Sequence, residues 1–257
     1  MIKTLLRGFL FLILLLALLL AGPVWLLTSG AVVTDAHWSS LDRTSAGLAP
    51  LATDTQEAVI QVYAAPAYNW RGAFGVHPWI AIKAEGDTSY RLYQVMGWRQ
   101  PTVVLANDTP DRAWFGSAPI LLADYRGERA AALIPQIEEA VARYPSAERY
   151  RVWPGPNSNT FVAWVAREVE GFDVALPVTA VGKDYLFGSV IAPTPSGSGY
   201  QLSIEGVLGI LVAWEEGIEI NLLGMSLGVD LKRLALKLPG IGRLGMAPAV
   251  LGNGSGD

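Results

Sequence analysis

Residues 150–167 read YRVWPGPNSNTFVAWVAR, and this stretch indicates how the chain is organised. The apolar residues before the prolines predict a short strand over 149–153, which Pro154-Gly155-Pro156 ends. Asn and Ser are favoured residues at the start of a helix, so we expect a helix over residues 157–168. This helix carries Phe161, Val162 and Val165, which makes it too apolar to face solvent and predicts that it packs in a core.

Short runs rich in Val, Ile, Tyr and Trp lie on both sides of this stretch and predict strands. The runs are 58–63, 76–83, 90–95 and 102–105 before it, and 201–204, 208–214, 218–223 and 227–231 after it. Between them, apolar residues at helical spacing predict a helix over 127–144, and Pro135 inside it predicts a kink or a helix in two pieces. This order predicts an α+β domain over residues 56–250, with additional C-terminal strands.

The N-terminal segment predicts a membrane anchor over residues 1–29. Residues 8–27 carry no charge, and at about 1.5 Å per helical residue they span about 30 Å, the hydrocarbon thickness of a bilayer. Lys3 and Arg7 precede the segment, which favours a cytoplasmic N-terminus and an exported body. Gly22-Pro23 could bend the helix or end it early. A signal peptide cleaved near residues 29–31 is the alternative.

Two further parts of the chain are expected to lie outside the domain. Residues 30–55 are rich in Ser, Thr, Ala and Asp and predict a linker that could wrap the domain. Residues 251–257 predict a flexible tail.

Composition excludes several classes of function. The chain has no Cys and two His, which excludes disulfides, thiolate sites and a multi-histidine metal centre. A net charge of −4 gives no basic field for nucleic acid. We expect no cofactor and no metal, and as partners only membrane lipid along residues 8–27 and a peptide, lipid or envelope ligand in a cleft.

The strongest candidate for chemistry pairs His77 with Asn157-Ser158-Asn159. His77 lies in a predicted strand, and Ser158 opens the apolar helix, where unpaired backbone N–H groups could stabilise an oxyanion. A neutral imidazole nearby could take the proton of the serine. The alternative is that Ser158 or Asn157 only caps the helix, an interaction worth about 1 kcal/mol, and that His77 is a packed core residue.

Two other motifs give weaker evidence for a function. Gly240, Gly242 and Gly245 match G-x-G-x-x-G, but too little chain follows for a dinucleotide fold, so a turn-rich segment is expected. Glu215 and Glu219 would share a face of a strand, and paired carboxylates serve in glycoside hydrolysis. A solvated turn is the alternative for them.

HPWIAIK (77–83), YRVWPGPNSNTFVAWVAR, LPVTAVGKDY (176–185) and EEGIEINLLG (215–224) together resemble the uncharacterised bacterial family called domain of unknown function 3750. This resemblance implies a bacterial, membrane-associated protein with no assigned activity.

The chain is also distantly similar to circularly permuted papain-like proteins, which include the NlpC-like and lecithin retinol acyltransferase groups. They carry a strand His and, later, a Cys that opens a helix. The resemblance implies that His77 is the general base and that Ser158 replaces the nucleophilic Cys. Tyr93, Gln94 and Asn107 are candidates to orient the imidazole.

These observations lead to two hypotheses for a single-pass protein of the bacterial inner membrane. The first is an acyl or amide hydrolase or transferase that uses Ser158 and His77 in a cleft walled by Trp79, Trp98 and Trp153. The second is a non-catalytic envelope binding or scaffold module with the same cleft.

Overall fold

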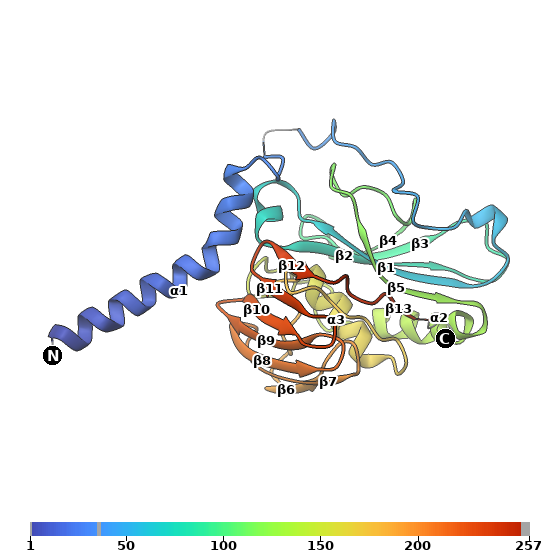
Figure 1. The fold of residues 1–257 in the computed structure, drawn as a ribbon. Helices are drawn as coiled ribbons and strands as arrows, with labels where there is room; N and C mark the ends of the chain where they lie inside the picture. Colours follow the sequence, from blue (N-terminus) through green and yellow to red (C-terminus); the bar gives the residue numbers. More distant parts are fainter. Residues whose placement is uncertain (1, 35–36, 253–257) are drawn as a thin grey trace.

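The apolar N-terminal segment forms a single helix, α1 (Ile2–Thr28), which is long and apolar enough to cross a membrane. The computed structural model describes residues 2–34 and 37–252. Helix α1 continues through Pro23 and bends where it reaches the body, as the proline allows (Figure 1). Leu19, Gly22 and Pro23 are buried against the body, so the last third of α1 is part of the folded structure.

The first sheet is built from the N-terminal half of the body and has the order β13-β5-β1-β2-β3-β4. Its strands are β1 (Val59–Pro66), β2 (Val76–Lys83), β3 (Arg91–Val95), β4 (Val103–Asn107), β5 (Ile120–Arg126) and β13 (Leu251–Gly252). All neighbours are antiparallel except β13, which runs parallel to β5. Strand β5 was not predicted, because its Leu and Ala residues do not favour a strand over a helix. The predicted tail thus begins with two paired residues, and residues 253–257 lie outside the described part of the chain.

Both faces of this sheet are buried. Helices α2 (Gly127–Ala142) and α3 (Ser158–Glu168) cover one face, where Ile60, Val62 and Ile80 pack against Ile137 and Phe161. The other face carries Tyr63, Trp79 and Trp114 and lies under the chain before β1, including the short helix η1 (Ala52–Asp54). Successive residues of β2 therefore point to opposite layers, which decides where the side chain of His77 lies.

The second sheet is an antiparallel meander in the order β12-β11-β10-β9-β8-β7-β6. Its strands are β6 (Ile191–Pro193), β7 (Gly199–Ile204), β8 (Leu208–Ala213), β9 (Gly217–Leu222), β10 (Met225–Asp230), β11 (Ala235–Leu238) and β12 (Gly242–Gly245). In Figure 1 helix α3 lies between this meander and the first sheet, and the side chain of Arg167 on α3 donates to Gln201 Oε1 on β7 at 2.9 Å.

The meander alternates in the opposite sense to most sheets. Polar side chains such as Gln201, Glu219 and Asn221 point inward and are buried, while aliphatic residues such as Ile204 and Ile210 are exposed. Antiparallel sheets commonly place the apolar face on the core and the polar face in water. The inner face therefore needs polar partners.

An ion network supplies these partners. Glu219 forms ion pairs with Lys183 Nζ at 2.8 Å and with Lys237 Nζ at 2.6 Å, and Asn221 donates to Asp184 Oδ2 at 3.0 Å. Burial alone would raise the pKa of Glu219, but the two lysine charges outweigh it and lower the pKa below its ordinary value. Both lysines and both carboxylates are buried, so each charge depends on its partners.

Two local expectations differ from the structure. Residues 149–153 form no strand, because no neighbouring strand pairs with them. Helix α2 runs unbroken through Pro135, so the two-piece alternative is wrong. In the described part of the predicted linker, Ser45 pairs with Arg112 and donates to Asp111, so this part lies against the body.

Replacing Glu219 by Leu would leave Lys183 and Lys237 without their shared carboxylate. We expect Glu219→Leu to lower the free energy of unfolding by about 3–5 kcal/mol. Glu139→Leu on the exposed side of α2 is the matched control, with an expected change within about 0.5 kcal/mol. Urea unfolding of the full chain in detergent, followed by tryptophan emission, measures both.

The difference in free energy of unfolding between wild type and Glu219→Leu should depend on pH in a definite direction. Because the folded-state pKa of Glu219 is depressed, its stabilisation is complete above its ordinary pKa of 4.5 and is lost as the pH falls through the lower folded value. The gap between wild type and Glu219→Leu should therefore narrow below pH 4.5. A gap that stays constant into strong acid would contradict the network.

Candidate functional site

The site is built around the start of α3. Asn157 is the N-cap, and its side chain accepts from the backbone N–H groups of Asn159 and Thr160. The hydroxyl of Thr160 is in turn paired with the backbone N–H of Asn157, which completes a capping box. Ser158 is thus the first residue of the helix and not its cap.

The amide groups of Asn157 and Asn159 fasten this helix start to other elements. Asn157 Nδ2 donates to the carbonyl oxygens of Val152 and Val181, at 3.1 and 2.9 Å. Asn159 Nδ2 donates to those of Val76 and Val181, at 3.0 and 2.8 Å. These contacts give both asparagines a positioning role, because they join α3 to β2 and to the segment before Lys183.

Gly182 permits this approach. Its φ is +100°, and a Cβ atom there would lie 2.4 Å from Asn157 Nδ2. Any other side chain would displace the cap, so the glycine in Gly182-Lys183-Asp184 is required by packing. Lys183, the next residue, enters the ion network of the meander.

Ser158 is buried, and its side chain is hydrogen-bonded with that of Tyr150. Burial raises the pKa of Tyr150, and a hydrogen bond with Ser158 opposes the shift. The serine hydroxyl therefore pairs with a phenol that remains protonated at neutral pH.

His77 lies in a different layer from α3. Its ring stacks on Trp114 with centroids 3.8 Å apart, and Nε2 lies 3.2 Å from Gln94 Oε1. Because the amide oxygen can only accept, this pairing places the proton on Nε2 and the lone pair on Nδ1. Burial lowers the pKa of His77 to about 4, so the ring is neutral at pH 7.

The two candidate catalytic groups, His77 and Ser158, line the same cavity. Among the described residues, no hydrogen bond joins His77 to Ser158. His77 points to the Trp79 face of the first sheet, and α3 packs on the opposite face, so they approach only around the end of β2. Of the predicted orienting residues, Gln94 contacts His77, Tyr93 donates to Glu138, and Asn107 ends β4 opposite Arg91.

The cavity has a volume of about 620 Å³ and a predominantly apolar wall. It is lined by residues of 67–77, 97–98, 114, 150–159, 181 and 223–225. Trp70, Trp98 and Trp153 line it and are about half exposed or more, which places them at its mouth. Trp79 does not line the cavity. It is buried, and its indole donates to the carbonyl of Pro110.

Arg71 is a functional candidate that sequence reasoning missed. It lies on the short helix η2 (Asn69–Ala73), and it is the one charged side chain among the residues that line the cavity, since His77 is neutral. Its guanidinium stacks over Trp70 at 4.9 Å. Nothing in the spacing of Trp70-Arg71 marks it in the sequence, because its role depends on how η2 folds over β2.

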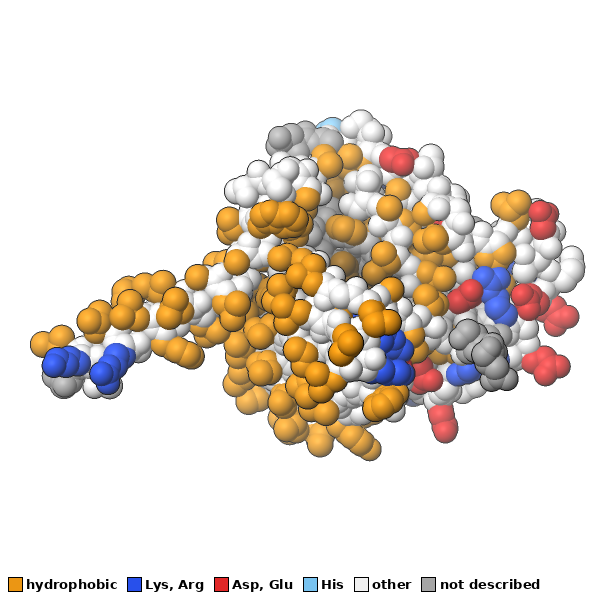
Figure 2. Space-filling view, in the orientation of Figure 1, with side chains coloured by type: hydrophobic (Ala, Val, Ile, Leu, Met, Phe, Trp, Pro, Cys, Tyr) orange, Lys and Arg blue, Asp and Glu red, His pale blue; other side chains and the backbone are white. Residues whose placement is uncertain are grey.

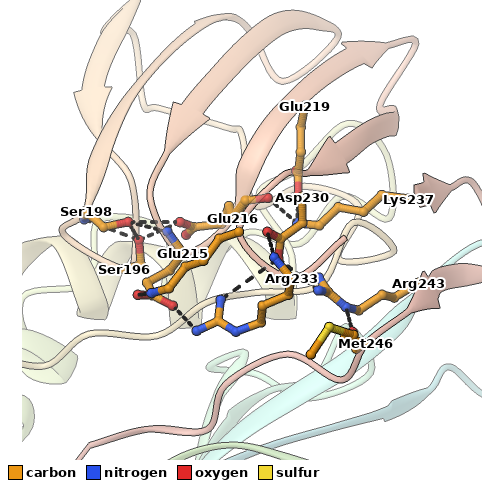
Figure 3. Close-up of polar contacts among 11 residues, drawn as sticks. Ser196, Ser198, Glu215, Glu216, Glu219, Asp230, Arg233, Lys237, Arg243 and Met246 are labelled. Atoms are coloured by element: carbon orange, nitrogen blue, oxygen red, sulfur yellow. Dashed lines mark hydrogen bonds and ion pairs between the residues drawn. The ribbon is translucent and has the colours of Figure 1, made fainter. Parts of the chain in front are cut away.

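The carboxylate cluster of the meander does not form a site. Figure 3 shows Glu215 turned toward Arg233, with which it pairs at 2.7 Å, while the side chain of Glu219 extends to Lys237, with which it pairs at 2.6 Å. Glu219 is enclosed by lysines, and the gap beside it has no room for a water molecule. Glycoside hydrolysis by Glu215 and Glu219 is therefore excluded by their positions. Of the G-x-G-x-x-G residues, Gly240 lies in the turn between β11 and β12, while Gly242 and Gly245 begin and end the strand β12.

Within the described residues, no three His, Cys, Asp or Glu side chains gather so that they could hold a metal ion.

The fold and the cavity define an α+β body, packed on the end of a long apolar helix, with a large apolar cavity whose wall includes the short helix η2 that α1 contacts. A family model described as "Protein of unknown function (DUF3750)" matches residues 57–185, half of the chain, and the chain belongs to this family. The match contains strands β1 to β5 of the first sheet, α2, α3 and most of the cavity wall, and it ends just after Lys183-Asp184. No curated protein matches the chain significantly. No solved structure does either.

Replacing His77 by Phe tests its neutral, buried state. The pKa of His77 is about 4 in the folded chain and 6.5 in the unfolded chain, so between these values the unfolded chain binds a proton that the folded chain does not. The free energy of unfolding of the wild type should therefore fall as the pH drops from about 6.5 toward 4. The expected loss is about 2 kcal/mol at pH 5, and His77→Phe should lack it while keeping the stack on Trp114. His37→Phe, at an exposed residue, is the control and should behave as wild type. Equal pH profiles for wild type and His77→Phe would refute this assignment.

Proposed function

We propose that this protein is a membrane-tethered binding protein that holds an anionic amphiphile, such as a fatty acid or an acidic lipid, in the cavity beside α3. The cavity itself carries the proposal. Its volume falls in the range of about 300–1,000 Å³ that small-molecule sites occupy, and its wall is mostly apolar. Arg71 at the mouth offers a cation to a carboxylate or phosphate, and no acidic side chain lines the cavity.

The position of the cavity supports a ligand drawn from the membrane. The residues of η2 that line it belong to the helix that α1 packs against. An amphiphile could therefore pass between the bilayer and the cavity without crossing much water. We propose further that Lys3 and Arg7 keep the N-terminus in the cytoplasm, so that the body faces outward from a bacterial inner membrane.

Photocrosslinking tests the binding function. Full-length protein in lipid nanodiscs that contain a diazirine fatty acid should yield crosslinked peptides from 67–77, 150–159 and 223–225 as well as from α1. Met225→Trp enlarges a side chain of the cavity wall and should remove the cavity crosslinks while leaving those of α1. Met246→Trp, at an exposed residue outside the cavity lining, should change neither.

Arg71→Gln should reduce cavity crosslinking by the fatty acid but not by the matching fatty alcohol, because only the acid pairs with a guanidinium. Mass spectrometry of tryptic peptides gives each yield. Crosslinks confined to α1 in wild type would contradict the proposal and leave the tether intact.

A second candidate function is acyl transfer or hydrolysis at a papain-like site. It is favoured by one observation: Ser158 at the start of α3 and His77 on β2 line one cavity although they lie far apart in the sequence. Catalysis would need His77 Nδ1 and the Ser158 hydroxyl, now paired with Tyr150, to approach each other when substrate binds.

Active-site labelling distinguishes this candidate from pure binding. If the serine is a nucleophile, a fluorophosphonate probe should label the full-length protein, and Ser158→Ala and His77→Ala should each abolish the labelling. Ser189→Ala, which changes a serine outside the cavity lining, is the control and should be labelled as wild type. Absence of labelling in wild type with several probes would leave binding as the function.

A further inference from the structure

The outer face of the meander is a continuous aliphatic surface, because its cross-strand rows are apolar throughout. One row crosses six strands: Tyr200, Val212, Ile218, Val229, Leu236 and Leu244. A second joins Ile191, Leu202, Ile210, Ile220 and Leu227. A third joins Ile204, Leu208, Leu222 and Met225.

These side chains are open to the surroundings in the isolated chain. Tyr200 is 68% exposed, Ile204 60% and Val212 54%, and no row contains a charged residue. Contiguous apolar patches of this kind on a protein surface mark an interaction site. The inner face of the meander holds the ion network of Glu219, Lys183 and Lys237, so the opposite, aliphatic face cannot pack on the core in its place.

Helix α1 packs directly on the meander. A Cβ atom on Gly22 would lie 2.1 Å from the carbonyl oxygen of Pro239, and one on Gly240 would lie 2.8 Å from Pro23 Cδ. Residues 239–241 form the turn between β11 and β12, so the membrane helix contacts the sheet where two of its strands meet. Figure 2 shows the apolar side chains continuing from α1 onto this side of the body.

The length of α1 then indicates how deep the meander lies in the bilayer. The uncharged segment 8–27 is only just long enough for about 30 Å of hydrocarbon, so all of it is needed to span the bilayer. Residues 8–18, which precede the docked part, cover only about 16 Å. The bilayer therefore extends past Leu19, along the part of α1 that contacts Pro239 and Ile241.

We infer that the outer face of the meander lies against the apolar layer of the bilayer that α1 crosses, as a second membrane contact. This inference rests on the proposed tether, but it does not require a ligand in the cavity. Lipid acyl chains are the occupant because the β11–β12 turn already lies at hydrocarbon depth and the face beyond it is uncharged.

The edge of the face has the composition of a membrane–water boundary. Trp214 follows β8 and is 67% exposed, and Lys232 lies over its ring at 5.1 Å. Tyr200 begins the six-strand row on a neighbouring strand. Trp and Tyr gather where hydrocarbon meets headgroups, and lysine there reaches toward the headgroups.

Single-cysteine labelling tests the inference, since the chain has no native cysteine. Ile220→Cys and Leu202→Cys report on the face, Leu12→Cys on α1, and Gln136→Cys on the exposed side of α2. Each full-length variant is labelled with an environment-sensitive fluorophore and reconstituted in phosphatidylcholine vesicles. Doxyl-labelled lipid then quenches from the bilayer, and iodide quenches from water.

We expect doxyl lipid to quench the labels at residues 220 and 202 roughly threefold more than the label at 136, and nearly as much as the label at 12. Iodide should show the reverse order. If the label at 12 is quenched by lipid while those at 220 and 202 behave like 136, the tether holds and the inference is wrong.

Two other outcomes also overturn the inference. Protection of 220 and 202 from both quenchers, lost when the protein is diluted in excess lipid, would show that a second copy covers the face. Failure of lipid to quench the label at 12 would remove the tether and, with it, the inference.

Discussion

Much of the structure depends on the carboxylate of Glu219 between two buried ammonium groups. Lys183 comes from the segment that receives the amides of Asn157 and Asn159, and Lys237 comes from β11. The same contact thus fixes the start of α3, the wall of the cavity and the inner face of the meander. A sheet held by charges on one side presents its aliphatic side chains on the other, and this explains why so apolar a surface lies outside the body.

The cavity and the exposed face are neighbours, and this arrangement favours binding over chemistry. Leu223 and Met225 line the cavity at the β9–β10 turn, and Met225 also ends one of the aliphatic rows. The polar groups around His77 and Ser158, in contrast, are already engaged by Gln94 and Tyr150. A preformed apolar chamber that opens beside an apolar surface suits a ligand that is itself mostly hydrocarbon.

Local patterns predicted most elements of the fold, because strands and helices with strong periodicity are specified by their own residues. The helix after Pro156, the strand over 76–83 and the uncharged N-terminal segment are examples. Leu-rich β5 was missed because its composition is ambiguous. Four of the seven meander strands, β7 to β10, were expected, whereas β6, β11 and β12 were not. The inverted orientation of the meander was not expected either, since it depends on Lys183, which lies far away in the sequence. A site that joins His77 and Ser158 was a hypothesis from the sequence, and both residues line one cavity in the folded chain. The positions of Arg71 and Tyr150 at that cavity could be found only from the folded chain.

The chain between α1 and β1 also limits how the body can move. An unattached linker of about 30 residues would let its ends separate by roughly 30 Å. Here the buried carboxylate of Asp111 accepts from the hydroxyl of Ser45 and the backbone N–H groups of Leu48 and Ala49. These hydrogen bonds attach the segment between α1 and β1 to the domain. The body is thereby held at one height above its anchor. For the binding function proposed above, this would restrict exchange of a ligand to the immediate surroundings of the anchor, unlike a carrier that travels between two surfaces.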